Sequence, residues 1–445
     1  MKILLLNPPR SPQNKILDSA PEEAKKFIHK KLIGPPLGLL TIAAAVSDYD
    51  FSLFDMKGEY DLDPDTPLLH DLTLQLLEEN KPDIVGVTVI TSEFDAAMEI
   101  FRTVKQYDPA ILTVAGGLHT TLCPGDFTDP AVNILCPGQA GHTFKEIVNT
   151  TEGGLSYRNI PGIIINTAEG PIQSNGKPEP WNAAKDNFLM PDRSLLDRWR
   201  STYKVGKNTE PATYLFTSLG CPYKCTFCSI WCEFESKYYQ RDLESIITEL
   251  HTIDYPIVRF ADANTIVNVK FIEELFSRIS EEGIRKEFIM DIRADTAVDH
   301  PTLIEKLAKG GLKVVICGFE SFRDEELENY NKKLPAGIIE ESIRIFHQNG
   351  IMLRGNYVVP GHYKHNDFQA LAEYADSHRV SYAGYTILTP MPGTPLYHEM
   401  EDNIIDHDLT KYNFFNCITK TSLPLDEFHY EVGKLWLIKK GTDVI

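Results

Sequence analysis

Apolar and polar positions in the first 150 residues alternate between short continuous apolar runs and longer segments with helical spacing. The apolar runs predict strands at 2–6, 51–54, 84–89, 111–115 and 132–136. The segments between and after them predict helices at 36–47, 68–79, 93–106 and 143–150. Short strands that alternate with helices are typical of a parallel sheet covered on both faces. We therefore expect a doubly wound, Rossmann-like domain over 1–150, with its ligand site beyond the carboxyl ends of the strands.

The pattern changes after residue 150 and then returns to the same alternation. Residues 151–205 predict a linker that contains a small hairpin near 160–172. A second series of apolar runs predicts strands at 214–218, 258–260, 288–291, 314–317, 352–359 and 385–388. Helices are predicted between them at 243–251, 270–281, 301–309 and 336–348. This α/β series predicts a partial (β/α)6 barrel over 206–398, with its chemistry at the carboxyl ends of the strands. Residues 399–445 are expected to form a short C-terminal extension.

The composition is that of an ordinary globular chain. Of the 445 residues, 42% are hydrophobic and 24% are charged, which is enough apolar material for a core. The net charge of −19 argues against nucleic acid or an anionic membrane as the main partner. The apolar start of the chain is interrupted at Asn7 and Pro8, too early for a signal peptide, and the apolar stretch at 37–46 is too short to span a bilayer, which takes about 20 residues. We expect a cytoplasmic, monomeric protein.

Four of the eight cysteines lie close together in the chain, at Cys221, Cys225, Cys228 and Cys232. The first three form a C-x-x-x-C-x-x-C run directly after the first predicted strand of the second series. Three thiolates in one loop can each bind one iron of a [4Fe–4S] cube and leave the fourth iron open. A structural zinc site is the alternative, but it usually takes four ligands in paired short spacings. We expect Cys232 to pack as a small hydrophobic side chain instead.

The cysteine spacing, its strand context and the barrel that follows resemble the radical S-adenosylmethionine (SAM) superfamily. Phe227 matches the aromatic residue that usually precedes the third cysteine of that family. In that family the open iron binds the amino and carboxylate groups of SAM, and an electron from an external donor cleaves SAM to a 5′-deoxyadenosyl radical. The resemblance therefore implies a [4Fe–4S] cluster, SAM and an external electron donor.

Segments after the later strands are also similar to motifs of this superfamily. They include the second-strand motif at 260–264, the G-x-E-S signature at 318–321 and the P-x-P-G-T-x-L-Y ending of the barrel at 390–397. The resemblance implies that SAM contacts come from these segments and from the other strand ends, at Phe227, Asp262, Asn264, Arg293, Glu320, Ser321 and Tyr357. For Asp262, Arg293 and Glu320, a plain structural ion pair is the alternative interpretation.

Glycine-rich turns follow several strands of the first domain. Glycine lets the backbone approach a ligand closely, and exposed N–H groups can hold phosphate or amide oxygens, although ordinary strand–helix turns have the same composition. Together with N-P-P at 7–9 and P-P-L-G at 35–38, these turns resemble the cobalamin-binding domain that precedes many radical SAM enzymes. The resemblance implies cobalamin contacts from Pro9, Pro36, Leu37, Gly38, Thr91, Ser92, Gly116, Gly117, His119, Gly138 and Gln139.

The sequence departs from the cobalamin-domain pattern in two places. Many such domains carry D-x-H-x-x-G, whose imidazole binds cobalt. The nearest match here, at Asp376 to His378, lies in the barrel domain and has Ser381 in place of the glycine, so we interpret it as a helix-end coincidence. His119 follows a strand of the right domain but lacks the motif, and the radical SAM branch commonly holds cobalamin without a histidine. Gln139 stands where the family usually has an acidic residue, and a cobalamin-free version of the domain is an alternative.

Taken together, the resemblance implies a cobalamin-dependent radical SAM methyltransferase. A deoxyadenosyl radical would remove hydrogen from an unactivated carbon, which would receive a methyl group from methylcobalamin. The compact layout resembles the glutamine C-methyltransferase that acts on methyl-coenzyme M reductase, so the predicted substrate is a protein glutamine side chain. The sequence identifies no catalytic side chain.

Three other functions share parts of this sequence pattern. An enzyme of the same kind that methylates or rearranges a small molecule or lipid is the main alternative. A cobalamin or iron–sulfur sensor would need a partner-binding module, usually basic for DNA, and none is visible. A methylthiotransferase would need three further cysteines in the first domain, which holds only Cys123 and Cys136.

Overall fold

The computed structural model describes the whole chain except residues 29–33, 168, 175–188, 205–209, 381 and 438–445. Contacts divide the chain into two compact units. The first comprises Met1–Pro12 and Ile33–Tyr203, and the second comprises Gln13–Leu32 and Lys204–Ile445. Residues 13–32 thus belong to the second unit, although the sequence analysis assigned them to the first domain. Part of the predicted linker, 175–188, lies outside the described residues.

The first unit is built on a seven-stranded sheet with the order β2-β1-β3-β4-β5-β6-β7. Its strands are β1 (Lys2–Asn7), β2 (Asp50–Asp55), β3 (Ile84–Thr88), β4 (Leu112–Gly116), β5 (Ile134–Cys136), β6 (Ile164–Thr167) and β7 (Gly170–Gln173). The first five pair in parallel and correspond to the five predicted strands. The hairpin predicted in the linker is present as β6 and β7, and it extends this sheet because β6 pairs antiparallel with β5.

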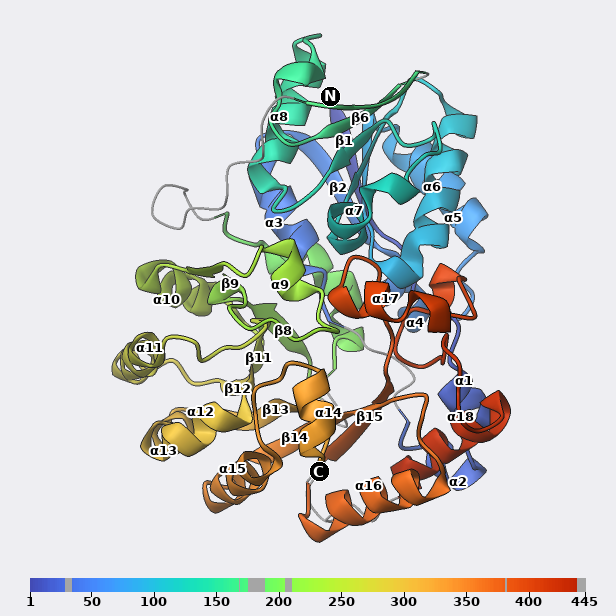
Figure 1. Cartoon of the computed structure of the whole chain (residues 1–445). Coiled ribbons are helices and arrows are strands. Elements are labelled where there is room, and N and C mark those ends of the chain that lie inside the picture. The colour runs from blue at the N-terminus through green and yellow to red at the C-terminus, as the bar shows by residue number, and fades with distance from the viewer. Residues whose placement is uncertain (29–33, 168, 175–188, 205–209, 381, 438–445) are drawn as a thin grey trace. The chain divides into compact units, whose positions relative to one another are not determined.

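Helices cover both faces of this sheet, as predicted. They are α3 (Leu37–Ala45), α4 (Met56–Leu62), α5 (Leu69–Asn80), α6 (Phe94–Tyr107), α7 (Leu118–Leu122) and α8 (Gly141–Glu152). Helices α5 and α6 lie on one side of the strands and α3 and α8 on the other (Figure 1). Successive residues of β1 point to opposite faces: Leu4 and Leu6 belong to one buried cluster, and Ile3 and Leu5 belong to the other. Burial on both faces is the reason for the continuous apolar run in this strand.

The second unit is built on six parallel strands in the order β15-β14-β13-β12-β11-β8. They are β8 (Ala212–Leu215), β11 (Ile257–Phe260), β12 (Glu287–Asp291), β13 (Leu312–Glu320), β14 (Met352–Val359) and β15 (Tyr382–Ile387). The first and last strands in chain order are the two edges of the sheet, so the barrel is partial, as predicted. A separate two-stranded ribbon is formed by β9 (Ser218–Gly220) and β10 (Tyr238–Gln240).

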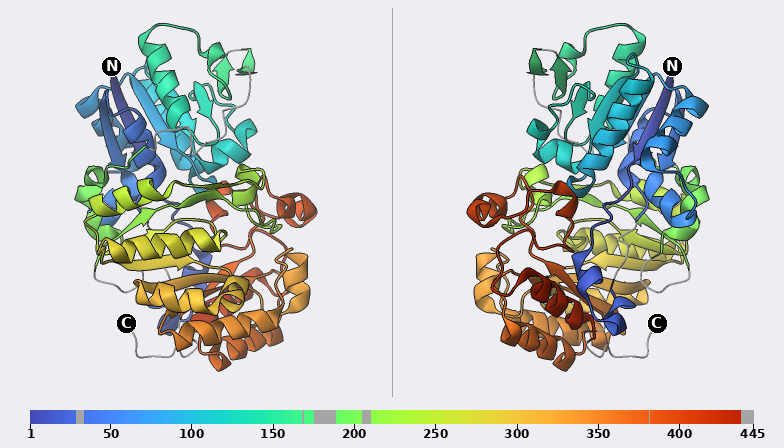
Figure 2. Two further views of the ribbon diagram at one scale, coloured as in Figure 1. Left: turned by 90° about the vertical axis from the view of Figure 1, so that its left-hand side faces the viewer. Right: turned by 90° about the vertical axis from the view of Figure 1, so that its right-hand side faces the viewer.

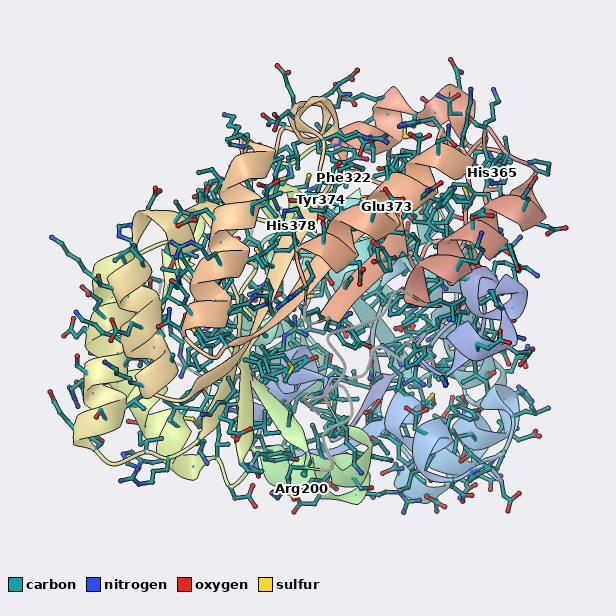
Figure 3. All side chains as sticks on the ribbon, turned by 90° about the horizontal axis from the view of Figure 1, so that it is seen from below. Arg200, Phe322, His365, Glu373, Tyr374 and His378 are labelled. Atoms are coloured by element: carbon teal, nitrogen blue, oxygen red, sulfur yellow. The ribbon has the colours of Figure 1, made fainter. Side chains whose placement is uncertain are left out.

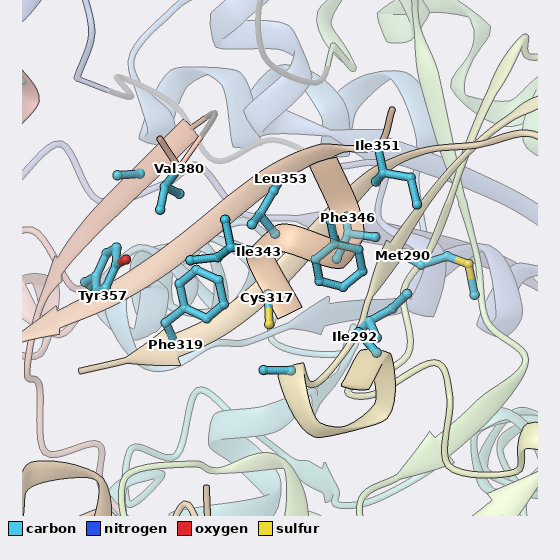
Figure 4. Close-up of a cluster of buried hydrophobic side chains, with 14 of the residues drawn as sticks. Met290, Ile292, Cys317, Phe319, Ile343, Phe346, Ile351, Leu353, Tyr357 and Val380 are labelled. Atoms are coloured by element: carbon cyan, nitrogen blue, oxygen red, sulfur yellow. The ribbon is translucent and has the colours of Figure 1, made fainter. Parts of the chain in front are cut away.

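Most connections in the second unit are helical. The helices are α9 (Ile230–Glu233), α10 (Leu243–Thr252), α11 (Val269–Glu281), α12 (Ala294–Asp299), α13 (Pro301–Lys309), α14 (Asp324–Asn329), α15 (Ala336–Gln348), α16 (His365–Ser377), α17 (Pro395–Glu399) and α18 (Leu425–Lys434). Helices α10, α11, α13 and α15 lie along the outer face of the sheet (Figures 1 and 2). In Figure 4, Phe319 and Leu353 from neighbouring strands pack beside Ile343 and Phe346 of α15, and Cys317 is buried among them.

The segment 13–32 contributes two short helices to this unit, α1 (Lys15–Ser19) and α2 (Glu22–Lys25). Both contact α18. The backbone N–H of Ile16 donates to the carbonyl of Phe415 at 3.2 Å. A Cβ at Gly433 would lie 2.6 Å from the side chain of Ala20, so glycine permits this close packing. Chain positions about 400 residues apart therefore meet within one unit.

The interpretation of Asp376 to His378 as a helix end is confirmed. His378 caps the carboxyl end of α16, and its Nδ1 lies 2.9 Å from the carbonyl of Tyr374. The two rings lie 4.3 Å apart, side by side in Figure 3. Ser381 lies outside the described residues. Within the part of the chain that the structure describes, no helix is both long and apolar enough to cross a bilayer.

Candidate cofactor sites

Most of the predicted SAM-binding residues fall at one edge of the six-stranded sheet. The strands are parallel, so their carboxyl ends lie at the same edge. Asp262 and Asn264 follow β11, Arg293 follows β12 and Glu320 ends β13. Tyr357 differs because it lies inside β14, opposite Glu320 in register. Its ring is fully buried and stacks on another tyrosine of the core.

The cysteine loop begins where β9 ends. Gly220 has a φ of +78°, and a Cβ there would collide with the carbonyl oxygen of Lys237, so the turn into the loop requires glycine. Within the loop, the N–H of Cys228 donates to the carbonyl of Cys225 at 3.1 Å. The indole N–H of Trp231 donates to the same carbonyl at 2.8 Å. The loop conformation is therefore fixed by its own backbone and by the first turn of α9.

The spacing of the sulfur atoms distinguishes the two metal sites that the sequence allowed. Among the described residues, no three of the sulfurs of Cys221, Cys225, Cys228 and Cys232 lie within 4.8 Å of one another. Tetrahedral zinc with Zn–S bonds of about 2.3 Å would hold its sulfurs about 3.8 Å apart. Moreover, the Cys232 thiol donates to the carbonyl of Cys228 at 3.5 Å. The donor set fits a cluster in which each thiolate binds a different iron better than it fits one zinc ion.

Two cations lie beside the cysteine loop. The ammonium group of Lys332 is buried and lies 2.9 Å from Glu320. The guanidinium of Arg293 lies 3.9 Å over the ring of Tyr223, a residue of the loop itself. Burial raises the pKa of the Cys221 thiol, and the positive charges of Arg293 and Lys332 oppose that rise. Nearby cations favour the thiolate, which is the form that binds metal.

Asp262 has the most unusual surroundings of the predicted residues. It is only 3% exposed, and its Oδ1 accepts hydrogen bonds from the Thr217 N–H and hydroxyl at 3.0 Å and from the Ser218 hydroxyl at 2.5 Å. Its Oδ2 and both amide atoms of the buried Asn264 have no hydrogen-bond partner among the residues that the structure describes. Burial raises the pKa of Asp262 to about 7, although its donors oppose the rise. Unpaired buried polar atoms are costly, so this cradle suits a ligand with an amino group.

Glu320 and Ser321 are held differently. Glu320 has a φ of +64°, a conformation that costs a non-glycine residue about 1–3 kcal/mol and that is concentrated at functional sites. A Cβ at Gly318 would collide with its carboxylate. The Ser321 hydroxyl donates to the Glu326 carboxylate at 2.5 Å, so its proton is already used within the protein. Phe227, the remaining predicted residue, packs edge-on against Tyr330 with ring centroids 5.7 Å apart.

The ion-pair alternative applies to two of the three charged residues. Arg293 pairs with Asp295 at 2.7 Å, and Glu320 pairs with Lys332. Asp262, in contrast, is bonded only to neutral donors. Lys332 was missed by the sequence analysis because it follows the G-x-E-S signature by eleven residues in a segment without a recognised motif. A search for basic residues in the segment that follows the G-x-E-S signature could have identified Lys332.

The turns at the carboxyl edge of the first sheet are shaped by glycine. Gly117 has a φ of +97°, and a Cβ there would lie 2.7 Å from the backbone of Val89. Gly138 has a φ of +77°, and its N–H donates to the Thr121 hydroxyl at 2.9 Å. No atom lies within 4 Å of the place of a Cβ at Gly38, near the start of α3. A side chain would therefore fit at Gly38, whereas the packing at Gly117 leaves no room for one.

The residues predicted to contact cobalamin differ in exposure. The half-buried ones are Pro9, Pro36, Leu37, Gly116, Gly117 and Gly138. The exposed ones are Gly38 and Gln139, and the buried ones are Thr91, Ser92 and His119. Thr91 and His119 meet, since Nδ1 of the imidazole lies 3.2 Å from the threonine hydroxyl. The imidazole is 1% exposed, and burial lowers its pKa while Asp126 opposes that change.

A buried polar network at the ends of β1 and β2 was not predicted. The Asn7 amide donates to Asp55 at 2.6 Å, and the hydroxyl of Tyr203 donates to the same carboxylate at 2.6 Å. The buried Glu93 pairs with Lys57 at 2.6 Å. Burial raises the pKa of the Glu93 carboxyl, and Lys57 opposes that rise. Partners 48 and 148 residues apart leave no local pattern by which sequence could find them.

Two known families match separate segments of the chain. Residues 215–375 match the radical SAM superfamily, and residues 28–148 match the B12 binding domain. A radical SAM domain implies a [4Fe–4S] cluster and SAM, and a B12-binding domain implies cobalamin. The predicted cofactors are therefore confirmed through the domains that hold them.

Relatives that align with most of this chain include proteins named as methyltransferases and a cyclase. An uncharacterized methyltransferase of Pyrococcus horikoshii is 27% identical over 411 residues, covering 89% of this chain and 82% of the relative. The hopanoid C-3 methylase of Methylococcus capsulatus is 24% identical over 407 residues, covering 90% and 75%. The anaerobic magnesium-protoporphyrin IX monomethyl ester cyclase of Rubrivivax gelatinosus is 27% identical over 370 residues, covering 79% and 64%.

Solved structures show the same fold. The radical SAM methyltransferase TsrM from Kitasatospora setae superposes with a TM-score of 0.69 at 17% identity, covering 90% of this chain and 76% of TsrM. The cobalamin-dependent SAM radical enzyme OxsB superposes with a TM-score of 0.72 at 15% identity, covering 98% and 65%. The chain thus matches a B12-binding domain followed by a radical SAM domain, is similar in sequence to proteins named as methyltransferases, and shares its fold with TsrM and OxsB.

Proposed function

We propose that this protein is a cobalamin-dependent radical SAM methyltransferase that transfers a methyl group to an unactivated carbon. One observation carries the proposal. Asp262 Oδ2 and the Asn264 amide are buried without a hydrogen-bond partner among the described residues, and they lie at the same sheet edge as the three-cysteine loop. When bound, SAM on the cluster supplies a radical that removes hydrogen, and cobalamin supplies the methyl group.

The side chains of the second unit bind and orient SAM in this proposal. Asp262 Oδ2 and Asn264 Oδ1 accept hydrogen bonds from the amino group of SAM, because both are buried acceptors without a partner among the described residues. Arg293 lies near the SAM carboxylate and contributes positive charge beside the loop. Glu320, held by Lys332, accepts hydrogen bonds from the ribose hydroxyls. Asp262, Arg293 and Glu320 are fixed by protein contacts before the ligand arrives, which lowers the entropic cost of positioning them.

For the substrate we favour a small organic molecule. The relatives support this choice by their names, which specify a hopanoid, a magnesium-protoporphyrin ester and, in Streptomyces wedmorensis, a cytidylyl-2-hydroxyethylphosphonate. None of these names supports the predicted protein glutamine or methyl-coenzyme M reductase as a substrate. A glutamine-containing peptide is therefore included among the candidate substrates of the experiment below.

Ring closure without methylation is the second candidate function. Two relatives are named as cyclases of magnesium-protoporphyrin IX monomethyl ester, from Rubrivivax gelatinosus and Cereibacter sphaeroides. A cyclase needs the radical but does not consume a methyl group from SAM. The two functions therefore differ in a product that can be measured.

The experiment is anaerobic purification with cobalamin, followed by incubation with SAM and a chemical reductant. Three candidate substrates are supplied separately: a hopanoid, a porphyrin ester and a glutamine-containing peptide. Methylation predicts S-adenosylhomocysteine and 5′-deoxyadenosine in equal amounts with a methylated product, whereas cyclisation predicts deoxyadenosine alone. A protein that retains no cobalamin and forms no S-adenosylhomocysteine with any substrate would contradict the proposal.

A further inference from the structure

Three potential metal ligands of the first unit converge outside the three-cysteine loop. One ligand atom each from His119, Cys123 and Asp126 lies within 4.8 Å of the other two. Local structure gathers them: the Cys123 N–H donates to the His119 carbonyl at 2.8 Å, and the Asp126 N–H donates to the Cys123 carbonyl at 3.1 Å. The end of α7 and the following 3-10 turn (Pro124–Asp126) therefore place all three side chains on one side of this segment.

The imidazole is the fixed member of the group. Its ring is fully buried and contacts Phe94 and Phe127, with centroids 5.1 and 5.8 Å away. Nδ1 lies 3.2 Å from the Thr91 hydroxyl. Nε2 faces the cluster, and it makes no aligned hydrogen bond even though an Asp126 oxygen lies 3.1 Å away. A buried nitrogen without a hydrogen bond, aimed at a thiol and a carboxylate, indicates a ligand for that nitrogen.

We propose that His119 Nε2, Cys123 Sγ and an Asp126 carboxylate oxygen bind a Zn²⁺ ion, with water in the fourth position. Nitrogen, sulfur and oxygen donors together suit zinc, whereas Mg²⁺ and Ca²⁺ take oxygen ligands. The Thr91 hydroxyl lies 3.2 Å from Nδ1. In the zinc-bound form Nδ1–H would donate to this hydroxyl and leave the Nε2 lone pair for the metal, the usual outer-shell arrangement of a zinc-bound histidine. Binding releases the proton of the Cys123 thiol to solvent, and no electron is transferred.

The site can reach zinc geometry by small side-chain movements. Zinc bonds of about 2.0–2.3 Å place tetrahedral ligand atoms about 3.3–3.7 Å apart, so the group must contract. The Asp126 side chain is 45% exposed and Cys123 is half-buried, so these two can turn toward the fixed imidazole. Their exposure also provides an entry path and room for the water. The proposal assigns the His119 imidazole to zinc rather than to cobalamin.

Zinc is measured in the full-length protein after reconstitution with iron, sulfide and cobalamin, by elemental analysis after equilibration with zinc and a weak chelator. Because an incompletely loaded cysteine loop could itself take up zinc, the same measurement is made with Cys221, Cys225 and Cys228 all replaced by alanine. We expect one zinc per chain in both proteins. Zinc-edge X-ray absorption should show a single sulfur ligand at about 2.3 Å and nitrogen or oxygen ligands at about 2.0 Å. No retained zinc, or zinc held only when the loop cysteines are present, overturns the proposal.

Variants identify the ligands. Cys123→Ala and Asp126→Asn should each weaken zinc binding at least tenfold, because even outer-shell changes cost about 10–100-fold. Cys123→His supplies another zinc ligand at the same place and should retain the ion. The controls are Cys136→Ala, a buried thiol on β5, and Asp129→Asn, a carboxylate that pairs with Arg102 at 2.8 Å. Equal zinc in Cys123→Ala and in the controls would refute the site.

His119→Ala separates this site from the cobalamin site. We expect this variant to lose zinc and to keep cobalamin. Loss of cobalamin with zinc retained would show that the imidazole belongs to the cobalamin site and that the zinc proposal is wrong. Iron content and S-adenosylhomocysteine formation report only on the proposed methyltransferase function, so failure of one proposal is distinguishable from failure of the other.

Discussion

The carboxyl edges of the two sheets, where the sequence predicts the cofactor contacts, are built differently. The edge of the second unit carries charged side chains whose positions are set by partners, such as Lys332 beside Glu320 and Arg293 over Tyr223. The edge of the first unit is shaped by glycine turns such as Gly117, where the backbone itself comes close. If both edges bind the predicted cofactors, we expect side-chain chemistry to recognise the ligand at the second edge and backbone shape to do so at the first. Removing one group should therefore have different consequences at the two edges.

The largest expected effect is at the cysteine loop. Cys225→Ala removes one of the three thiolates predicted to bind the cluster, so we expect loss of the iron cluster and deoxyadenosine formation at background level. Cobalamin content should not change, because the predicted cobalamin contacts lie in the first unit. Iron and cobalt analysis with a SAM-cleavage assay tests this. Cys232→Ala is the matched control, and its iron content should equal that of the unaltered protein.

A backbone change at the other edge should reduce both stability and cobalamin retention. Gly117→Ala adds a Cβ that clashes with Val89 and forces a side chain into a positive φ, at a cost of about 1–3 kcal/mol of unfolding free energy. Gly125→Ala is the control, since a Cβ there meets no atom within 4 Å. Denaturant unfolding and bound cobalamin are the measurements. Equal results for the two variants would contradict the idea that backbone shape forms this edge.

A smaller effect is expected from pH at Asp262. Burial raises the pKa of this carboxyl to about 7, so it gains a proton as the pH falls through 7 and can no longer pair with the amino group of SAM. Between pH 8 and pH 6 the ionised fraction falls about tenfold, and the KM for SAM should rise by a similar factor. Asp262→Asn should have a high KM that does not vary with pH over this range, with unchanged iron content. A pH-independent KM in the unaltered protein would exclude this role.

The smallest effect is expected at the helix end that resembles a cobalt-ligating motif. His378→Ala removes a bond to the carbonyl of Tyr374 at the end of α16 and leaves the first unit unaltered. Surface changes of this kind usually alter stability by no more than about 0.5 kcal/mol, although the lost ring contact adds to that figure. Cobalamin content should equal that of the unaltered protein. A cobalt deficit would place part of the cobalamin site in the second unit.

The sequence was a good guide where a residue's role depends on its immediate neighbours in the chain. Buried parallel strands are continuous apolar runs, so the strands of both sheets could be predicted. The assignment of the three cysteines to a cluster rests on their spacing and stays a prediction. Short helices such as α4 and α7 were missed because five to seven residues give no clear periodicity. The hairpin β6–β7 was found but was placed in a linker, because its pairing with β5 depends on a contact that sequence does not reveal.

The same limit applies to the sites. Asp262 and Asn264 stand in a motif next to a strand, whereas Lys332 and Glu93 acquire their surroundings from distant segments. Lys332 pairs with Glu320, twelve positions earlier in the chain, at the edge of the second sheet. Glu93 pairs with Lys57 in the first unit. His119 was recognised as a residue of interest, but its relation to Cys123 and Asp126 depends on a turn whose geometry only the structure shows.

The packing of α1 and α2 against α18 has a consequence for the order in which the chain folds during synthesis. Helices α1 and α2 are made before the strands of the second unit, and their contacts around Phe415 and Gly433 involve residues made about 400 positions later. The strands of the first unit are complete once Gln173 has been made. This sheet can therefore assemble while α1 and α2, which lie between β1 and α3 in the chain, still lack their partners in the second unit. Closing so long a loop costs entropy before any contact repays it, which makes this step a slow one. Helices α1 and α2 therefore gain these contacts only after the residues of α18 have been made.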